Sequence, residues 1–200
     1  MAPAPALALA FALTFALFPQ SAAYPAAPSR SYWIGLGSVS SKLAMPRLVE
    51  TSAAFIDSDL LLKSFAAPKA SAGVKFLGRY GAEVFWQPPR SSASRTAAGE
   101  RVSGEFEQLG LAAVYFMGGI HGFELYSAAR VSNYRYTIDA EDALARWGES
   151  ESGLGYGAAI GATYAMPAGP GAKCEAAYDL YDGERPERSA SLSFSLIWTF

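Results

Sequence analysis

The last ten residues alternate more regularly than any other stretch of the chain. Leu192, Phe194, Leu196, Trp198 and Phe200 form one phase, and the other phase is three serines, an isoleucine and a threonine. A period of two is typical of a β-strand, whose successive side chains point to opposite faces. Large apolar side chains opposite small polar ones favour a strand with lipid on one side and a narrow polar lumen on the other.

Seven earlier segments carry the same alternation less regularly. The eight predicted strands are residues 32–42, 70–77, 81–87, 105–116, 121–134, 153–164, 172–181 and 190–200. Turn residues separate them, so the sequence predicts an all-β protein, an eight-stranded antiparallel up-and-down transmembrane β-barrel.

The predicted connections alternate in length. Long ones follow the first, third and fifth strands, a moderate charged one follows the seventh, and short ones lie between; the longer four are residues 44–69, 90–104, 135–152 and 182–189. Outer-membrane barrels have short periplasmic turns and longer external loops. Pro88 and Pro89 are expected to end the third strand, and residues 140–147 are a candidate helical turn. An earlier start of the second strand, at Leu60, stays open.

The N-terminus has the pattern of a secretory signal peptide. Residues 4–18 are an apolar run, and small residues follow it up to Ala23. The run is shorter than the roughly 20 residues of a membrane-spanning helix, which disfavours the alternative of an uncleaved anchor. We therefore expect a signal peptide at residues 1–23, a periplasmic lead at 24–31 and a barrel domain at 32–200, located in the cell outer membrane.

Three motifs resemble the small outer-membrane barrels of Gram-negative bacteria of the OmpA/OmpX-like kind. The first motif is the last strand, which ends on Phe200 with Trp198 two residues earlier. The second is residues 80–86, which are similar to the aromatic motif on the third strand of these barrels, with Glu83 pointing inward. The third is residues 153–157, which are similar to the Gly/Tyr-rich sixth strand of these barrels. The resemblance implies that Leu196, Trp198 and Phe200 belong to the signal that the barrel-assembly machinery recognises. It also implies outer-membrane lipid and lipopolysaccharide as surroundings.

The strand phases place six charged side chains in the lumen: Lys75, Glu83, Glu124, Arg130, Glu175 and Asp179. Charges in a narrow interior are costly unless they are paired, so Lys75 and Arg130 are expected to bridge carboxylates. Two acids are then left over, either sharing a proton with bound water or lying near the lumen ends. A structural polar plug is favoured over a proton or small-ion path, because eight strands enclose little more than their own side chains.

The remaining chemistry excludes several functions. The net charge of -2 argues against a nucleic-acid partner, and the single Cys174 has no internal disulfide partner. No metal, phosphate-binding or triad motif is present, so no cofactor, metal or catalysis is expected. Lipid A-modifying barrel enzymes use a histidine with a nearby serine, whereas His121, the only histidine, precedes Gly122-Phe123 and is read as a strand-end residue.

The predicted function is structural or adhesin-like surface interaction through the external loops, with an unknown extracellular ligand. Arg90, Arg95 and Arg101 in the second loop are candidates to meet lipopolysaccharide phosphates, or are simply solvated. One alternative is a narrow ion-conducting pore, whose conductance in planar bilayers would change on mutating Glu83 or Arg130. The sequence also leaves open a lipid A-modifying enzyme and a soluble lipocalin-like carrier, and the outward apolar last strand argues against the carrier.

Overall fold

The computed structural model describes residues 30–46, 48–50, 55–57, 61–95, 101–120, 122–141, 146–165, 169–183 and 185–200. The predicted signal peptide lies outside these residues, and so does His121, which is predicted to be a strand-end residue. No helix in the described part of the chain is long and apolar enough to cross a membrane.

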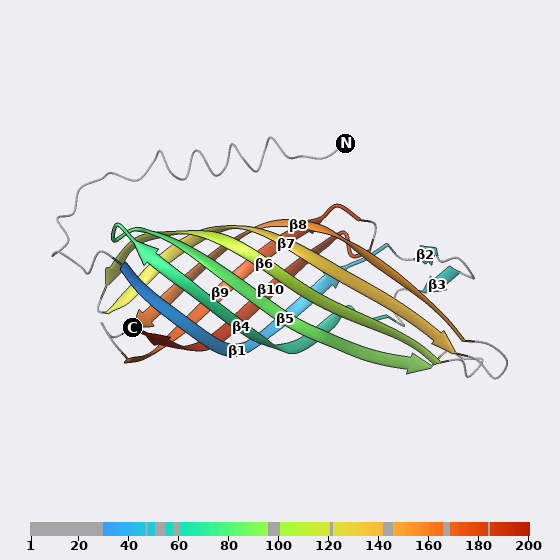
Figure 1. Cartoon of the computed structure of the whole chain (residues 1–200). Helices are drawn as coiled ribbons and strands as arrows, with labels where there is room; N and C mark the ends of the chain where they lie inside the picture. Colours follow the sequence, from blue (N-terminus) through green and yellow to red (C-terminus); the bar gives the residue numbers. More distant parts are fainter. Residues whose placement is uncertain are drawn as a thin grey trace.

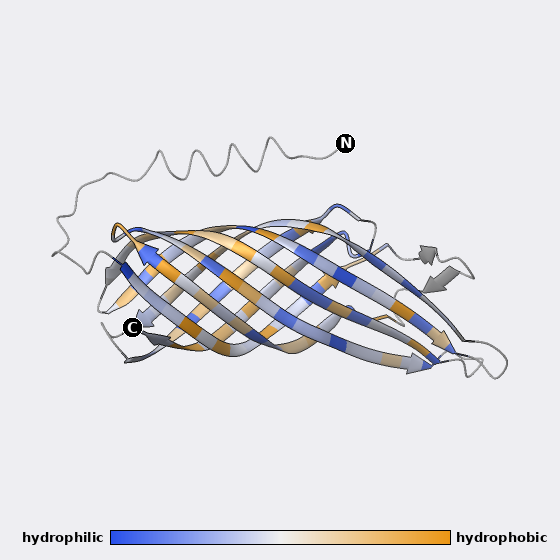
Figure 2. Cartoon of the chain, viewed as in Figure 1, coloured by the Kyte–Doolittle hydropathy of each residue, from blue (hydrophilic) through white to orange (hydrophobic). Residues whose placement is uncertain are grey.

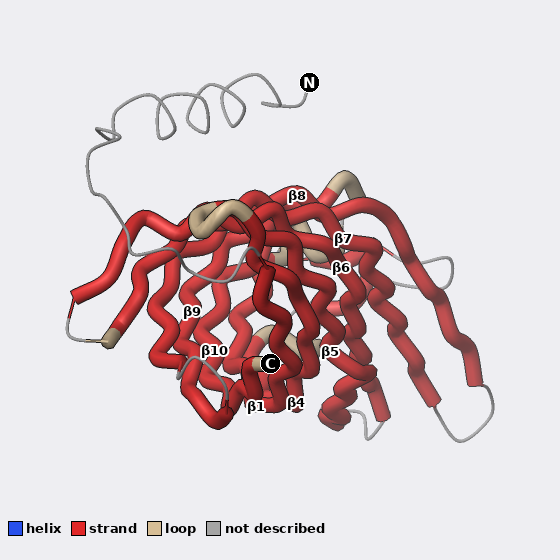
Figure 3. Tube along the Cα trace, turned by 60° about the vertical axis from the view of Figure 1, so that its left-hand side comes forward, coloured by secondary structure: helices blue, strands red, loops and turns tan. Residues whose placement is uncertain are grey.

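Eight long strands form one closed antiparallel barrel (Figures 1 and 3), as the alternation predicted. They are β1 (Arg30–Ala44), β4 (Ser64–Phe76), β5 (Tyr80–Arg95), β6 (Arg101–Ile120), β7 (Phe123–Glu141), β8 (Arg146–Ala165), β9 (Gly169–Tyr181) and β10 (Arg188–Thr199). A separate two-stranded sheet of β2 (Leu48–Glu50) and β3 (Phe55–Asp57) lies in the connection between β1 and β4.

Each strand pairs with its neighbours in sequence, and β1 also pairs with β10 to close the sheet. The pairing runs from Trp33 opposite Thr199 to Ala44 opposite Arg188. Beyond this ladder the backbones of Tyr32 and Phe200 exchange two hydrogen bonds of 2.9 and 3.0 Å. The end of the barrel with Phe200 and the turn at residues 77–79 is called the terminal end here, and the opposite end is the loop end.

The predicted outward phase is confirmed along the part of the barrel nearer the terminal end. Leu36, Ile160 and Leu196 each expose 66% or more of their surface on the outer face, and their neighbours in sequence point inward. Figure 2 shows how hydrophobic and hydrophilic residues alternate along the strands. A belt of exposed large apolar side chains is what a membrane-spanning barrel presents to lipid.

Toward the loop end the large apolar side chains lie on the inner face of the strands instead of the outer face. On β6, Leu109 and Leu111 face outward, but Val102 and Phe106 are buried inside; on β7, Val131 faces outward, but Tyr136 and Ile138 are buried inside. Above the belt, therefore, these strands have a polar outer face and an apolar inner face, which is the arrangement of a protein in water.

Two predicted loops are wrong, because strands occupy most of them. β5 and β6 pair up to Arg95 opposite Arg101, and β7 and β8 pair up to Glu141 opposite Arg146. Only residues 96–100 and 142–145 separate them, so Ala140 and Trp147 are strand residues and not a helical turn. The first loop is also shorter than predicted, since β4 begins at Ser64.

Pro88 and Pro89 do not end the third strand. Gln87 pairs with Gln108 and Arg90 with Phe106, so the two prolines together face one residue of β6 in a register shift. On its other side β5 pairs with β4 only as far as Trp86. Prolines are tolerated at a bulge on a strand edge because their missing N–H breaks no ladder there.

The turns at the terminal end match the prediction in part. The turn predicted at residues 78–80 lies one residue earlier, at residues 77–79, and Leu77 and Gly78 both have positive φ, of 52° and 70°. The turn predicted at residues 117–120 is wrong, because Gly118–Ile120 pair with β7 after a register shift at Phe116 and β6 extends to Ile120. Gly118 has a φ of 132°, which suits a glycine at such an irregularity.

The reversal of phase generates a testable prediction about where lipid ends. Ile160→Arg places a charge in the outer apolar belt and is expected to lower the free energy of unfolding in micelles or vesicles by about 2–4 kcal/mol. Ser91→Arg adds the same charge above the belt, opposite Glu105, and is expected to change it by less than about 0.5 kcal/mol. Equal effects of the two substitutions on urea denaturation would contradict this placement of the belt.

Candidate functional site: the lumen and the protruding sheet

Glu175 is the centre of a buried charge network in the lumen. Its carboxylate lies 2.7 Å from Lys69 Nζ, and 3.4 Å from both Arg130 Nη1 and Lys173 Nζ. The Tyr126 hydroxyl also donates to it, at 2.9 Å. Arg130 extends the network to Asp179 through a second contact of 3.4 Å. Because these side chains come from β4, β7 and β9, the network ties opposite walls of the barrel together.

Glu83 holds the next position toward the terminal end. It accepts a hydrogen bond of 3.1 Å from the Trp33 indole and forms an ion pair with Lys173. Gly73 makes this possible, since a Cβ at that position would collide with the Trp33 ring. The inward-facing Gly73 therefore leaves room for a large side chain from another strand.

Lys75 and Glu124 form a separate pair near the terminal end. The Lys75 ammonium lies 2.5 and 2.7 Å from the two carboxylate oxygens and 4.4 Å from the centre of the Phe116 ring. Both side chains keep part of their surface exposed. This pair is therefore more accessible to water than the network around Glu175.

All six predicted lumen residues lie inside, but the pairing differs from the expectation. Lys75 bridges Glu124 and Arg130 bridges Glu175 and Asp179, as expected, whereas Glu83 and Glu175 also contact Lys173 and Lys69. These contacts join four cations to four carboxylates, so no acid is left over. Lys69 lies in β4 but falls in the segment predicted to be the first loop. Lys173 was signalled by its position two residues before Glu175 on the same face.

Aromatic rings pack against the cations of the lumen. The Phe85 ring lies 4.2 Å from the Arg130 guanidinium and 5.5 Å from the Lys69 ammonium, measured to the ring centre. Cations attract the face of an aromatic ring, most strongly where water is excluded. The lumen is therefore filled by paired charges and rings, which supports the polar plug over an open path.

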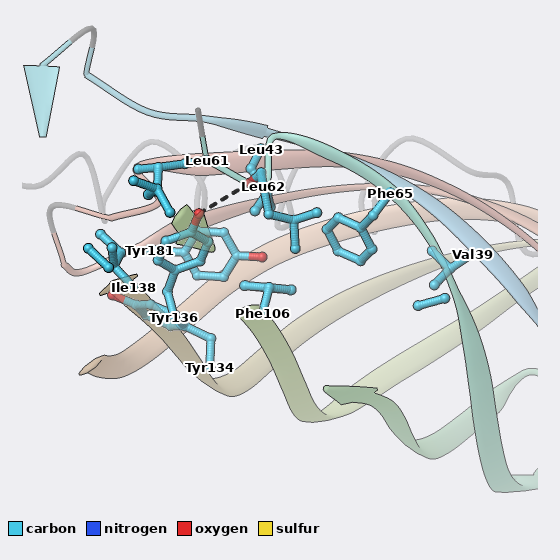
Figure 4. Close-up of a cluster of buried hydrophobic side chains, with 13 residues drawn as sticks. Val39, Leu43, Leu61, Leu62, Phe65, Phe106, Tyr134, Tyr136, Ile138 and Tyr181 are labelled. Carbon is cyan, nitrogen blue, oxygen red and sulfur yellow. Dashed lines mark hydrogen bonds between the residues drawn. The ribbon is translucent and has the colours of Figure 1, made fainter. Parts of the chain in front are cut away.

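A cluster of apolar residues covers the charge network at the loop end (Figure 4). Leu61 and Leu62, from the connection before β4, point into it and meet side chains that include Phe106, Tyr136 and Tyr181. The Tyr136 hydroxyl donates to the Leu62 carbonyl at 3.3 Å, and the Leu43 amide donates to the Lys63 carbonyl at 2.6 Å. We call this cluster the apolar cap. It places a layer with few polar groups between the charged lumen and the outside.

Strands β5 to β8 continue past the outer apolar belt as a four-stranded protruding sheet, whose inner face carries part of the cap, including Val102 and Ile138. β8 pairs with β9 only from Gly155 onward, and β5 leaves β4 after Trp86. The last apolar outward row contains Leu109 and Leu154, and the next outward row contains Glu107 and Arg135, which form an ion pair of 3.3 Å. The protruding sheet thus begins where the lipid-facing belt ends.

The connection between β9 and β10 closes over the β8 edge of this sheet. Arg185 contacts Glu149 at 2.8 Å and Glu151 at 2.9 Å, and the Asp182 carboxylate accepts a hydrogen bond of 2.8 Å from the Leu154 amide. Unpaired strand edges are prone to pair with other chains. These contacts protect part of the β8 edge.

The other predicted site residues fall into two groups. Leu196 and Trp198 lie on the outer face of β10. Phe200 directly follows β10 and stacks on Tyr32, with 6.2 Å between the ring centres. The role of the three residues as an assembly signal stays a prediction. Arg95 and Arg101 come together on the outward face of the protruding sheet, whereas Arg90 pairs with Phe106 in the inward phase. Among the described residues there is no group of three or more potential metal ligands.

The network around Glu175 predicts a strong dependence of stability on that carboxylate. Glu175→Gln removes one carboxylate that three buried cations share and is expected to lower the free energy of unfolding by about 3–5 kcal/mol. Glu107→Gln breaks the exposed pair with Arg135 and is expected to cost less than about 1 kcal/mol. Urea denaturation in micelles measures both. A Glu175→Gln barrel as stable as the parent would show that the network is not what holds the walls together.

Comparison with solved structures shows the same architecture. Ail of Yersinia pestis, the attachment invasion locus protein, solved in complex with the heparin analogue sucrose octasulfate, is 10% identical over 86% of this chain and all of its own, with a TM-score of 0.59. Neisserial surface protein A is 15% identical over 84% of this chain and 97% of its own, with a TM-score of 0.59. A major outer membrane protein from Thermus thermophilus is 12% identical over 86% of this chain and all of its own, with a TM-score of 0.60.

No protein-family model matches the sequence, and no curated protein is similar to it. At these identities the solved structures establish the fold alone, and they agree with the closed eight-stranded barrel described above. The chain therefore has the fold of the small eight-stranded outer-membrane β-barrels.

Proposed function

We propose that this protein acts at the cell surface as a non-catalytic interaction protein, and that the protruding sheet is its binding surface. The observation that carries the proposal is the length of β5 to β8. From Leu109, in the last row of the belt, β6 runs about 26 Å to Arg101, at about 3.3 Å per residue. At a strand tilt of about 45°, this length corresponds to roughly 19 Å along the barrel axis. A barrel with only a structural role in the membrane has no need of this extension.

Two further observations support an external role. Ail, which has the same fold, is described as an attachment invasion protein and was solved with a heparin analogue. In this chain, the described hollows of the barrel lie on its outer face, such as one of about 740 Å³ over Ala70 and Ala72 beside Trp86. These hollows suit lipid chains, which favours outer-membrane lipid as the surroundings of the belt and leaves the protruding sheet for other partners.

A narrow pore is the weaker alternative. An ion crossing the lumen would have to separate the pairs around Glu175 and then cross the apolar cap beneath Leu61 and Leu62. Apolar constrictions exclude water and thereby ions. The two layers together favour a closed lumen.

The proposal predicts that shortening the protruding sheet abolishes binding and leaves the barrel intact. Ser92 pairs with Gly104 and Ile138 with Glu149, so an Asn-Gly turn replacing residues 93–103 and a second replacing residues 139–148 keep both hairpins in register. A non-adherent bacterial strain that displays the full chain is expected to gain adherence to epithelial cells. The doubly shortened chain, displayed at the same level, is expected to lose it.

The two single shortenings serve as matched controls for each other and locate the binding surface on β5–β6 or on β7–β8. Adherence that is unchanged by the double shortening would contradict the proposal. So would a full chain that confers no adherence at all.

A further inference from the structure

Two arginines face each other directly at the tip of the protruding sheet. Arg95 of β5 pairs in register with Arg101 of β6, and both side chains lie exposed on the outward face. Side chains at directly opposite positions have Cβ atoms about 4.5–5.5 Å apart, and like charges in such pairs are destabilising. The chain therefore maintains a local repulsion in the last described row of β5 and β6, at the end of the protruding sheet.

Other arginines of this region have their charge compensated. Arg135 contacts Glu107 on the outward face, and Arg185 contacts Glu149 and Glu151 on the inner face. Within the described part of the chain, neither Arg95 nor Arg101 forms an ion pair. Glu141 of β7 pairs in register with Arg101 on its other side, so the row from Arg95 to Glu141 holds two cations and one carboxylate and keeps an excess of positive charge.

The pair also lies on an open corner of the sheet. β5 has left β4 well below this point, and the outward row beneath the pair contains only Ala93 and Ser103 on these two strands. Small side chains below the two guanidinium groups leave the approach from outside clear. A ligand that compensates the repulsion can thus contact both arginines at once.

From this juxtaposition we propose that Arg95 and Arg101 form a binding site for a sulfate or phosphate group of an acidic saccharide. The site deepens the proposed surface role and rests on it. Guanidinium groups donate paired hydrogen bonds that match the oxygens of such anions, and a tetrahedral anion accepts from two guanidiniums together. The height above the belt, roughly 19 Å, puts the site beyond the lipid headgroups at the membrane surface.

Isothermal titration calorimetry tests the site. A sulfated heparin hexasaccharide is titrated into the purified full chain in dodecyl maltoside. The detergent is uncharged, so the protein supplies all the cations. The parent is expected to bind. Arg95→Gln or Arg101→Gln alone is expected to weaken binding about tenfold, and the double variant about a hundredfold. Arg95→Lys with Arg101→Lys keeps the charge but loses the paired donors, and an intermediate affinity is expected.

Arg79→Gln is the matched control, since it removes the same charge at the opposite end of the barrel. It is expected to leave the affinity within about twofold of the parent. The proposal is overturned if the parent does not bind, if the double glutamine variant binds as tightly as the parent, or if Arg79→Gln weakens binding as much. Unchanged heat-modifiability of the variants on gels excludes misfolding as the cause of any loss.

A second titration identifies the source of the anion. The same hexasaccharide is added to the chain in nanodiscs with and without lipopolysaccharide. Loss of binding only when lipopolysaccharide is present shows that phosphorylated sugars of the membrane occupy the site, and equal binding assigns it to an external sulfated saccharide. Because calorimetry needs no adherent cell, failure of this site and failure of the adherence role are distinguishable.

Discussion

In hydrocarbon, each backbone N–H or C=O without a partner costs several kcal/mol, so a sheet that spans a membrane must pair its first strand with its last. The ladder from Trp33–Thr199 to Ala44–Arg188 meets this requirement. Closure with eight strands then fixes the width of the interior, which leaves room only for side chains. The glycines on the inner face, the stacked rings and the paired charges are consequences of that narrow space.

The charges inside are tolerated because each carboxylate has a cation from another strand. Glu175 alone joins β9 to Lys69 on β4 and Arg130 on β7, across the barrel. Buried ion pairs add little net stability compared with apolar packing, but they are costly to break. In this barrel they define which walls face each other, and the apolar cap separates them from the water outside. The lumen is thereby filled by structural contacts, and the recognition role that we propose falls to the protruding sheet.

The membrane-facing half of the fold could be predicted from the sequence because lipid imposes an apolar outer phase, as on Leu192 to Phe200. The protruding sheet could not be predicted by the same rule, since its apolar residues, among them Phe106, Tyr136 and Ile138, face inward. The rule that apolar side chains point outward therefore predicts loops at residues 90–104 and 135–152. The prolines at 88 and 89 strengthened that reading, because a bulge on a strand edge has no distinctive sequence. The position of Lys69 in the lumen could not be predicted for a related reason, since Lys69 follows Pro68 in a segment that the sequence predicts to be a loop.

The central claim is that the chain closes into a barrel in the outer membrane, with its apolar face outward. Heat-modifiability of the membrane fraction tests it most directly, with the same detergent extract run on a gel with and without boiling. The account predicts that the protein fractionates with the outer membrane, and that the unboiled sample runs as a compact, faster band that boiling converts to a slower one. A single band of unchanged mobility in the soluble periplasmic fraction would contradict it, and the exposed aromatic phase of β10 would then need a different partner from lipid.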